Sequence, residues 1–311
     1  MVFRKFPCMF FNLYKRKMIN IYINDIKRGI PMARPFNSEL VFTEQLSEST
    51  LKAYHVGFDQ NKFRLEPVLN ILMNVIPEFM FGPHEGSTMQ ITDVWRKTRE
   101  AARQVYASND VQGRGEFGEI ILHFLLRDFH NTIPLLSKIY FKDSVDVPIK
   151  GFDGVQVQIK GDQKKLWLGE SKIYDNGVAG VSSLAKDVEN HIRNDYLRKE
   201  FNLISKKVPQ NIPERQHWLN LMSEHQRLDT IFNNICVPCV CTYSSDIFQT
   251  YNDATEAYFT AFERECRFLK QKFDGANVVT NVDIILMLFP IPSKPEFVSK
   301  LDERLKRAQN I

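Results

Sequence analysis

The residue types and spacing best suited to catalysis or metal binding are those of an aspartate followed, after sixteen residues, by Glu-x-Lys. These residues are Asp153, Glu170 and Lys172. Gly161 and Asp162 lie midway between the two acids and are a favoured two-residue hairpin loop. A turn at this pair pairs residue 160 with residue 163, and the same register places Asp153 opposite Glu170. Because side chains alternate along a strand, Lys172 shares the face of Glu170. The sequence thus predicts a hairpin that gathers three charged groups.

Two carboxylates that face each other across an antiparallel pair have Cβ atoms about 5 Å apart, where like charges destabilise the sheet. We therefore expect a cation between Asp153 and Glu170. Mg²⁺ suits the position, with Mn²⁺ as an alternative, because such ions prefer oxygen ligands and often keep water and phosphate in their shell. Lys172 supplies a second positive charge, whereas Ser171 points to the other face. These residues predict a metal-dependent phosphodiesterase site, and whether burial or the carboxylates control the pKa of Lys172 stays open.

This Asp, Glu-x-Lys arrangement resembles the PD-(D/E)XK nuclease superfamily, with Phe152 in the place of the usual proline. Glu-x-Lys also occurs by chance, and the alternative interpretation is a hairpin with a solvated, charged face. Three features favour the nuclease: the hairpin register, an apolar strand face that bears Val155 and Val157, and an acidic helix upstream. The reverse face, with Gln156 and Trp167, is expected to be the more solvated one.

The acidic helix is expected over residues 113–129 and carries Glu116 and Glu119 near its start. In nucleases that the chain resembles, a G-x-x-x-E pattern opens the first helix and its glutamate completes the metal site; residues 115–119 match that pattern. The resemblance implies Glu119 as the third carboxylate, with Glu116 as second choice. The alternative for both is an acidic first turn favoured by the helix dipole.

The implied reaction is hydrolysis of a phosphodiester by water. One or two Mg²⁺ ions on Asp153, Glu170 and Glu119 would polarise the phosphate and lower the pKa of a bound water. Lys172 would orient that water or stabilise charge on the phosphoryl oxygens.

The stretch from Gly113 to His191 is similar to the HamA family, the nuclease component of the Hachiman anti-phage defence system, and weaker similarity extends from about Ala33 to the C-terminus. The resemblance implies a restriction-endonuclease-like fold and DNA as substrate. It also implies a HamB-like superfamily 2 helicase, on a separate chain, that holds the nuclease inactive until it is triggered. No G-x-x-x-x-G-K-[ST] loop occurs in the sequence, so ATP-driven sensing would need another chain.

Composition is that of an ordinary soluble globular protein, with 43% hydrophobic and 25% charged residues among 311. Net charge is +4, but Met1 to Pro31 contains seven Lys or Arg and one Asp, so that leader carries +6 and the remainder −2. The leader is interpreted either as a DNA-binding arm or as translation from an upstream start, since Met18 and Met32 offer later ones. Its apolar run is too short to span a bilayer and lacks a signal cleavage site, so a cytoplasmic protein without membrane contact is expected.

The sequence contains five cysteines. Three of them lie in one apolar run: Cys236, Cys239 and Cys241. Four paired ligands for structural zinc are not evident, because Cys266 and His225 are distant and unpaired in spacing. The run is interpreted as a buried strand that uses cysteine as a small hydrophobe. His123 and His191 are interpreted as packing or helix-surface residues, with a position near the site as the alternative for each.

Order of elements predicts an α/β, restriction-endonuclease-like fold: a mixed central sheet of about four or five strands flanked by helices, with a helical N-terminal portion. The expected division is leader 1–31, helical region 32–110 and nuclease-like domain 111–311. Helices are expected over 62–80, 92–107 (capped by Thr92), 181–205 and 250–273, and after a capping box at 293–296; strands are expected over 138–142, 235–243 and 282–289. The 181–205 helix follows a break at 177–180, and its first turn, with Ser182, Ser183 and Lys186, is a candidate phosphate contact, serine capping being the simpler interpretation.

Two other functions stay open. One is a catalytically inert DNA-binding or helicase-regulating subunit of the same fold, although the slight acidity outside the leader disfavours strong unaided DNA binding. The other is an RNase of that fold.

Overall fold

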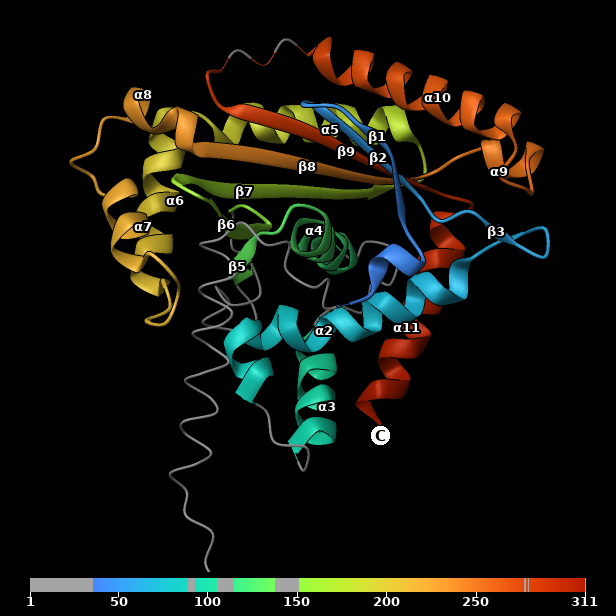
Figure 1. The fold of residues 1–311 in the computed structure, drawn as a ribbon, viewed down its shortest axis with the longest axis horizontal. Helices are drawn as coiled ribbons and strands as arrows, with labels where there is room; N and C mark the ends of the chain where they lie inside the picture. Colours follow the sequence, from blue (N-terminus) through green and yellow to red (C-terminus); the bar gives the residue numbers. More distant parts are fainter. Residues whose placement is uncertain are drawn as a thin grey trace, which may run out of the picture.

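In a computed structural model, the structure describes residues 36–88, 93–105, 115–137, 151–276, 278 and 280–310. Seven strands of these residues form one mixed sheet, in the order β1-β2-β9-β8-β7-β6-β5, and two more form a small ribbon, β3-β4 (Figure 1). The strands are β1 Thr43–Ser47, β2 Leu51–His55, β3 Phe58–Asp59, β4 Lys62–Phe63, β5 Ile133–Ser137, β6 Gly154–Lys160, β7 Gln163–Tyr174, β8 Ile235–Ser244 and β9 Asp283–Ile291.

Strand directions divide the sheet into a parallel centre and antiparallel margins. Neighbours β2, β9, β8 and β7 are parallel, whereas β1 is antiparallel to β2, and β6 to both β7 and β5. Central parallel strands are covered on both faces, which requires continuous apolar sequence rather than alternation. β8 meets this requirement, because every residue from Ile235 to Tyr243 is buried.

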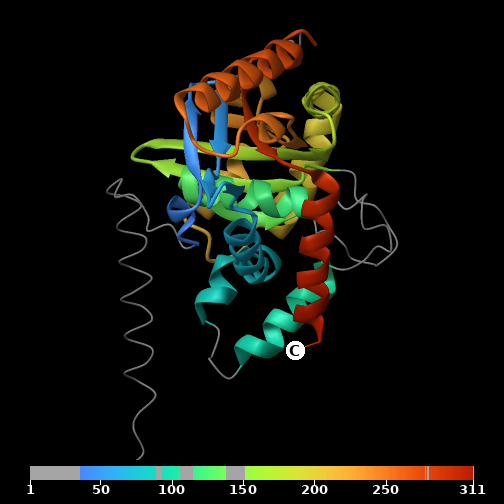
Figure 2. The same ribbon diagram turned by 90° about the vertical axis from the view of Figure 1, so that its right-hand side faces the viewer.

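Helices cover both faces of the sheet. α5 and α10 pack on one face, α4, α2 and α11 on the other, and α3 packs against α2 and α11 (Figures 1 and 2). One hydrophobic core lies on each side of the sheet. The helices are η1 Ser38–Leu40, α2 Leu65–Thr88, α3 Val94–Val105, α4 Glu116–Phe129, α5 Gly177–His191, α6 Asn194–Lys207, α7 Arg215–Leu221, α8 Leu228–Ile231, η4 Phe232–Asn234, α9 Ile247–Thr250, α10 Glu256–Asp274 and α11 Lys294–Gln309.

The predicted hairpin is confirmed in its turn and register. β6 and β7 pair from Lys160↔Gln163 to Gly154↔Gly169, around a two-residue loop in which Gly161 has φ 60°. A positive φ is a conformation that glycine adopts without steric cost, which explains the residue at this position. The ladder ends one residue short of Asp153 and Glu170, so the pairing of these two residues stays a prediction.

The interpretation of the reverse face of the hairpin as solvated is wrong. Gln156 and Trp167 are 2% and 4% exposed, because α4 covers that face. Gln156 is accommodated there by polar partners: its side-chain amide carbonyl accepts a hydrogen bond from Thr132 Oγ1, and its Nε2 donates to the carbonyl of His123 at 3.5 Å. A buried amide with partners on both ends does not need water.

Several predicted elements are confirmed: the fold class, both apolar strands and the last helix. Ser293 accepts a hydrogen bond from the amide of Glu296 at 3.3 Å, so the predicted capping box begins α11. Cys236, Cys239 and Cys241 are buried free thiols of β8, as expected of small hydrophobes. Three predictions lie outside the described residues, namely the leader over 1–31, the strand over 138–142 and the cap at Thr92.

Two predictions about extent are wrong. The helix expected over 181–205 is two helices, α5 and α6, and the residues 177–180 expected to form a break are the first turn of α5. The sheet is also larger than expected, because β1 and β2 join it ahead of the helical N-terminal part, where β3 and β4 form a separate ribbon. Within the described residues, no helix combines the length and the apolar character needed to cross a membrane.

We expect the stability of the fold to fall on acidification through His55. This residue ends β2 under the rings of Tyr258, Phe259 and Phe262 of α10, and burial lowers its pKa to about 4. Histidine in an unfolded chain titrates near pH 6.5, so the unfolded state binds the proton more readily and stability is lost as pH falls from about 6.5 to about 4.

Replacing His55→Phe should reduce that loss by up to about 3 kcal/mol, measured as the difference in urea unfolding free energy between about pH 7 and about pH 4.5. His225→Gln, at a position whose side chain is 86% exposed, is the matched control and should keep the wild-type difference. The same pH difference in His55→Phe and wild type would contradict the expectation.

Candidate active site

The candidate site forms where β6 and β7 separate. Their pairing ends at Gly154↔Gly169, but β7 continues to Tyr174 while its other edge stays paired with β8. Asp153 directly precedes β6 at this end, and its amide donates to the carbonyl of Gly169 at 2.9 Å. Asp153 Oδ2 then accepts hydrogen bonds from the backbone N–H of Ser171 at 2.9 Å and from Ser171 Oγ at 2.8 Å. The carboxylate thus takes the place that the next residue of a paired strand would occupy.

Glu170 and Lys172 project to the opposite face of β7 from the Ser171 side chain, toward α5. Glu170 Oε1 lies 2.5 Å from Nδ1 of His191, and Lys172 Nζ lies 2.7 Å from Asp187 Oδ2. The glutamate is 2% exposed, whereas the side chains of Lys172 and Asp187 are 26% and 32% exposed. Glu170 is therefore the floor of the site, and Lys172 lies at its solvent-facing side.

Electrostatics at the site favour a cation. Burial raises the pKa of Glu170 to about 7, and the charge of Asp153 acts in the same direction, whereas His191 and Lys172 partly offset both effects. Burial alone would lower the pKa of Lys172, but its hydrogen bond with Asp187 and the three neighbouring carboxylates outweigh burial and raise it. The pKa that the sequence left open is therefore controlled by the carboxylates, and Lys172 stays an ammonium.

His191 is held as the partner of the buried glutamate. Burial would lower its pKa, but the hydrogen bond and the charge of Glu170 outweigh burial, and Asp187 and Glu200 add to the increase. Its ring stacks on Tyr196 with centroids 4.5 Å apart and meets the edge of Phe152 at 5.1 Å. His191 is therefore both a packing residue, as the sequence predicts, and a polar partner of one of the candidate ligands.

α4 closes the site from the other face of the sheet. A Cβ added at Gly118 would lie 3.0 Å from Ser171 Oγ, and one added at Gly169 would lie 2.7 Å from Cδ2 of Leu122. The helix therefore lies against the strands at a distance that only glycine permits. Glu119 follows Gly118 directly in the first turn of α4 and is 7% exposed, so its side chain is buried on this helix.

The donor set of the site suits a hard divalent cation in part. Asp153 and Glu170 provide carboxylate oxygens, and the carbonyl of Ser171 faces the same strand edge as its N–H, because both groups of a strand residue point to one side. Among the residues that the structure describes, no three His, Cys, Asp or Glu side chains form a metal-binding cluster. Glu119 is thus not gathered with the other two acids. Two carboxylates still fit Mg²⁺, which keeps several waters and uses few protein ligands.

The predicted phosphate contact at α5 loses its basis. Ser182 and Ser183 lie in the second turn of the helix, since α5 begins at Gly177, and their amides are not those of a helix N-terminus. The Oγ atom of Ser183 accepts a hydrogen bond from the hydroxyl of Tyr174 at 3.3 Å. Lys186 is exposed on the same helix. Capping by these serines is therefore wrong, because the cap is Asn176, whose side chain accepts from the amide of Ala179 at 3.0 Å. Phosphate contact by Ser182, Ser183 and Lys186 stays a prediction, without the support of helix N-terminal amides.

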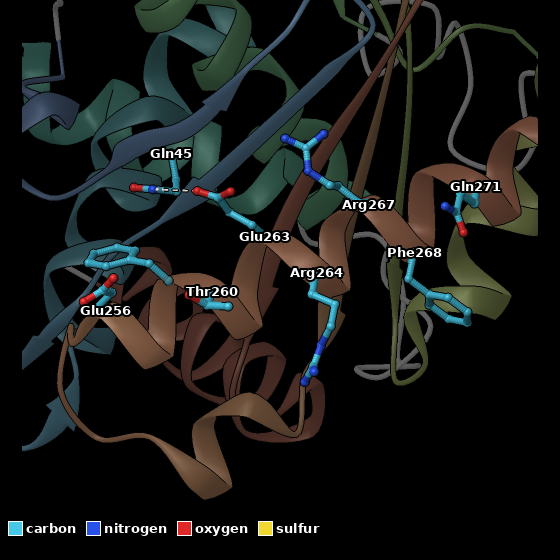
Figure 3. A pocket seen from close by; sticks show the side chains of 9 residues that line it. Gln45, Glu256, Thr260, Glu263, Arg264, Arg267, Phe268 and Gln271 are labelled. Atoms are coloured by element: carbon cyan, nitrogen blue, oxygen red, sulfur yellow. Dashed lines mark hydrogen bonds between the residues drawn. The ribbon is translucent and has the colours of Figure 1, made fainter.

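A groove of about 910 Å³ lies elsewhere, between α10 and β1 (Figure 3). Gln45 Nε2 donates to Glu263 Oε1 across it at 3.2 Å, and Arg267 forms an ion pair with Glu48 at 2.8 Å. Strands β2, β9 and β8 separate β1 from β7 in the sheet. This groove is therefore distinct from the candidate site.

Comparison with protein families gave one result that covers most of the chain. The HamA family model matches residues 34–305. A search of curated proteins found no match. The matched range includes β1 to β9 and every residue of the candidate site.

We expect Gly169→Ala to disturb the site through α4. The added Cβ would meet Leu122, whose side chain is fully buried, and overpacking of this kind costs about 1–3 kcal/mol. In a Leu122→Ala background Gly169→Ala should cost less than it does in the wild type, because the atoms that clash are gone. Urea unfolding of the single and double variants measures both effects.

Gly115→Ala is the matched control, since a Cβ at this position of the α4 N-cap has open space, and its effect should stay within about 0.5 kcal/mol. Strict additivity of Gly169→Ala and Leu122→Ala would show that the two residues are not in steric contact.

Proposed function

Because the chain belongs to the HamA family over residues 34–305, we propose that it is a Mg²⁺-dependent DNA nuclease that acts as the effector of a Hachiman anti-phage defence system. Family membership fits a component of that system. One observation carries the nuclease proposal: the Asp153 and Glu170 carboxylates converge with the Lys172 ammonium where β6 and β7 separate.

Each side chain has a role in the proposed hydrolysis of a phosphodiester. Asp153 and Glu170 would bind the ion, with Glu119 as a third carboxylate if the first turn of α4 moves closer. Mg²⁺, when bound, polarises the phosphate and lowers the pKa of water. Ser171 orients Asp153 through two hydrogen bonds. Lys172, charged and at the solvent side of the site, would orient water or stabilise the phosphoryl oxygens.

Substrate and partner follow from the family resemblance. DNA is the proposed substrate, and a HamB-like superfamily 2 helicase on a separate chain is the proposed partner. The charge of −2 outside the basic leader supports such an arrangement, because a slightly acidic surface gives weak unaided affinity for nucleic acid. The helicase would then supply most of the DNA contacts.

The competing function is a helicase-regulating or DNA-binding subunit of the same fold that does not cleave. One observation favours it: the described residues contain no three-ligand metal cluster. Burial of two adjacent acids beside a lysine argues against it, because an uncompensated pair of buried carboxylates is costly and a structural role does not require them.

We expect wild-type protein to cleave linear or circular duplex DNA with Mg²⁺ and not with EDTA, alone or with the helicase. Asp153→Asn and Glu170→Gln should weaken both Mg²⁺ affinity, measured by calorimetry, and cleavage. Lys172→Met should keep most of the affinity and lower the cleavage rate at saturating Mg²⁺ by about 10²-fold, because it removes only charge stabilisation.

Lys165→Met is the matched control on the same strand; this lysine forms an ion pair with Asp283 away from the site. Absence of EDTA-sensitive cleavage even with the helicase present would favour the inert subunit, and cleavage of RNA alone would favour an RNase. Equal Mg²⁺ affinity in Asp153→Asn and wild type would remove Asp153 from the metal site.

A further inference from the structure

Two residues of α5 contact the Glu-x-Lys pair one to one. His191 meets Glu170, and Asp187 meets Lys172. Four residues along a helix rise about 6 Å, and two residues along a strand rise about 6.6 Å. An i, i+4 pair on a helix that runs antiparallel to the strand therefore matches an i, i+2 pair on that strand. The correspondence explains why both contacts can form at once.

Close packing fixes the distance of α5 from the sheet. A Cβ added at Gly180 would lie 2.5 Å from Sγ of Cys241, and one added at Gly177 would lie 2.9 Å from Tyr243 and Leu269. The first turn of α5 thus rests almost directly on β8 and α10, and larger side chains at these glycines would raise it. This helix height lets the short Asp187 side chain reach Lys172.

Ring packing fixes the orientation of the imidazole. His191 stacks on Tyr196 of α6 with an interplanar angle of 10°, and Phe152 meets it edge-on at 72°. Phe152 directly precedes Asp153. The segment that carries the candidate ligand Asp153 therefore also packs against His191, the partner of Glu170. Nδ1 is left directed at Glu170 Oε1.

We propose that Asp187 and His191 are positioning residues of the active site: His191 sets the carboxylate of Glu170 for the cation, and Asp187 sets the ammonium of Lys172 for the phosphate. The inference rests on the proposed nuclease function and deepens it. The two contacts have different consequences, because one acts through a metal ligand and the other through a group that does not bind the metal. Hydrogen-bonded partners of ligating carboxylates typically contribute about 10–100-fold to metal affinity or activity.

The test for His191 uses two variants that separate ring packing from hydrogen bonding. His191→Phe keeps an aromatic ring between Tyr196 and Phe152 and removes the donor; His191→Asn loses the ring and keeps a donor at the Nδ1 position. We expect His191→Phe to raise the Mg²⁺ concentration at half-saturation, measured by calorimetry and by cleavage, by about 10-fold or more. His191→Asn should lie closer to wild type.

The test for Asp187 uses Asp187→Asn, which removes the charge and keeps the size. We expect the cleavage rate at saturating Mg²⁺ to fall by about 10-fold, with half-saturation and calorimetric Mg²⁺ affinity nearly unchanged. In a Lys172→Met background the same change should have no further effect on the rate, because the group it positions is gone. Glu189→Gln, an exposed position of α5 paired with Arg193, is the control for both tests and should behave as wild type.

The results of these tests distinguish a failure of the proposed positioning roles from a failure of the proposed nuclease function. Mg²⁺ binding and cleavage by wild type, with unchanged half-saturation in His191→Phe, would overturn the role of His191 and leave the nuclease standing. An equal loss of rate from Asp187→Asn with and without Lys172 would overturn the role of Asp187. Neither binding nor cleavage by wild type, with the helicase present, would overturn the nuclease and this inference together.

Discussion

The candidate site is organised by one hydrogen bond, in which a backbone N–H of β7 donates to a side-chain carboxylate and not to a neighbouring strand. β7 runs on beyond the end of β6, and the N–H of Ser171 on its vacated edge is taken by the carboxylate of Asp153. A buried amide must find an acceptor, so the end of one strand fixes the position of an acid. The acid then lies beside Glu170, whose pKa burial and this neighbour both raise. The remaining elements position or shield these two groups.

Glycines on both faces of β7 allow that arrangement to be enclosed. Gly118 and Gly169 admit α4 on one side, and Gly177 and Gly180 admit α5 on the other. The two helices differ in what they bring: α4 is mainly hydrocarbon and also buries four polar residues, whereas α5 contacts Glu170 and Lys172 through a histidine and an aspartate. α5 thus supplies hydrogen-bonding and charged partners on the face where Glu170 and Lys172 project, whereas α4 packs mainly through hydrocarbon on the other face.

Local patterns in the sequence were sufficient for the parts of the fold that are local. The hairpin register follows from Gly161-Asp162, and α11 follows from its capping box. Features that depend on distant partners were missed: β1 and β2 are strands because they join β9, and the 177–180 segment is helical because its glycines fit against β8. The same limit applies to His191, whose role comes from Tyr196 and Glu170. Its spacing from Asp187, one helical turn, was the available sign.

The place of β2 in the sheet links opposite ends of the chain. Leu51 to Ala53 pair with Leu286 to Leu288, so an early strand completes its ladder only against the last one. In a growing polypeptide, β2 has only its neighbour β1 as a partner until β9 has been made, and such non-local topologies fold slowly. The complete sheet, and any activity that depends on it, is therefore available only when translation is almost finished.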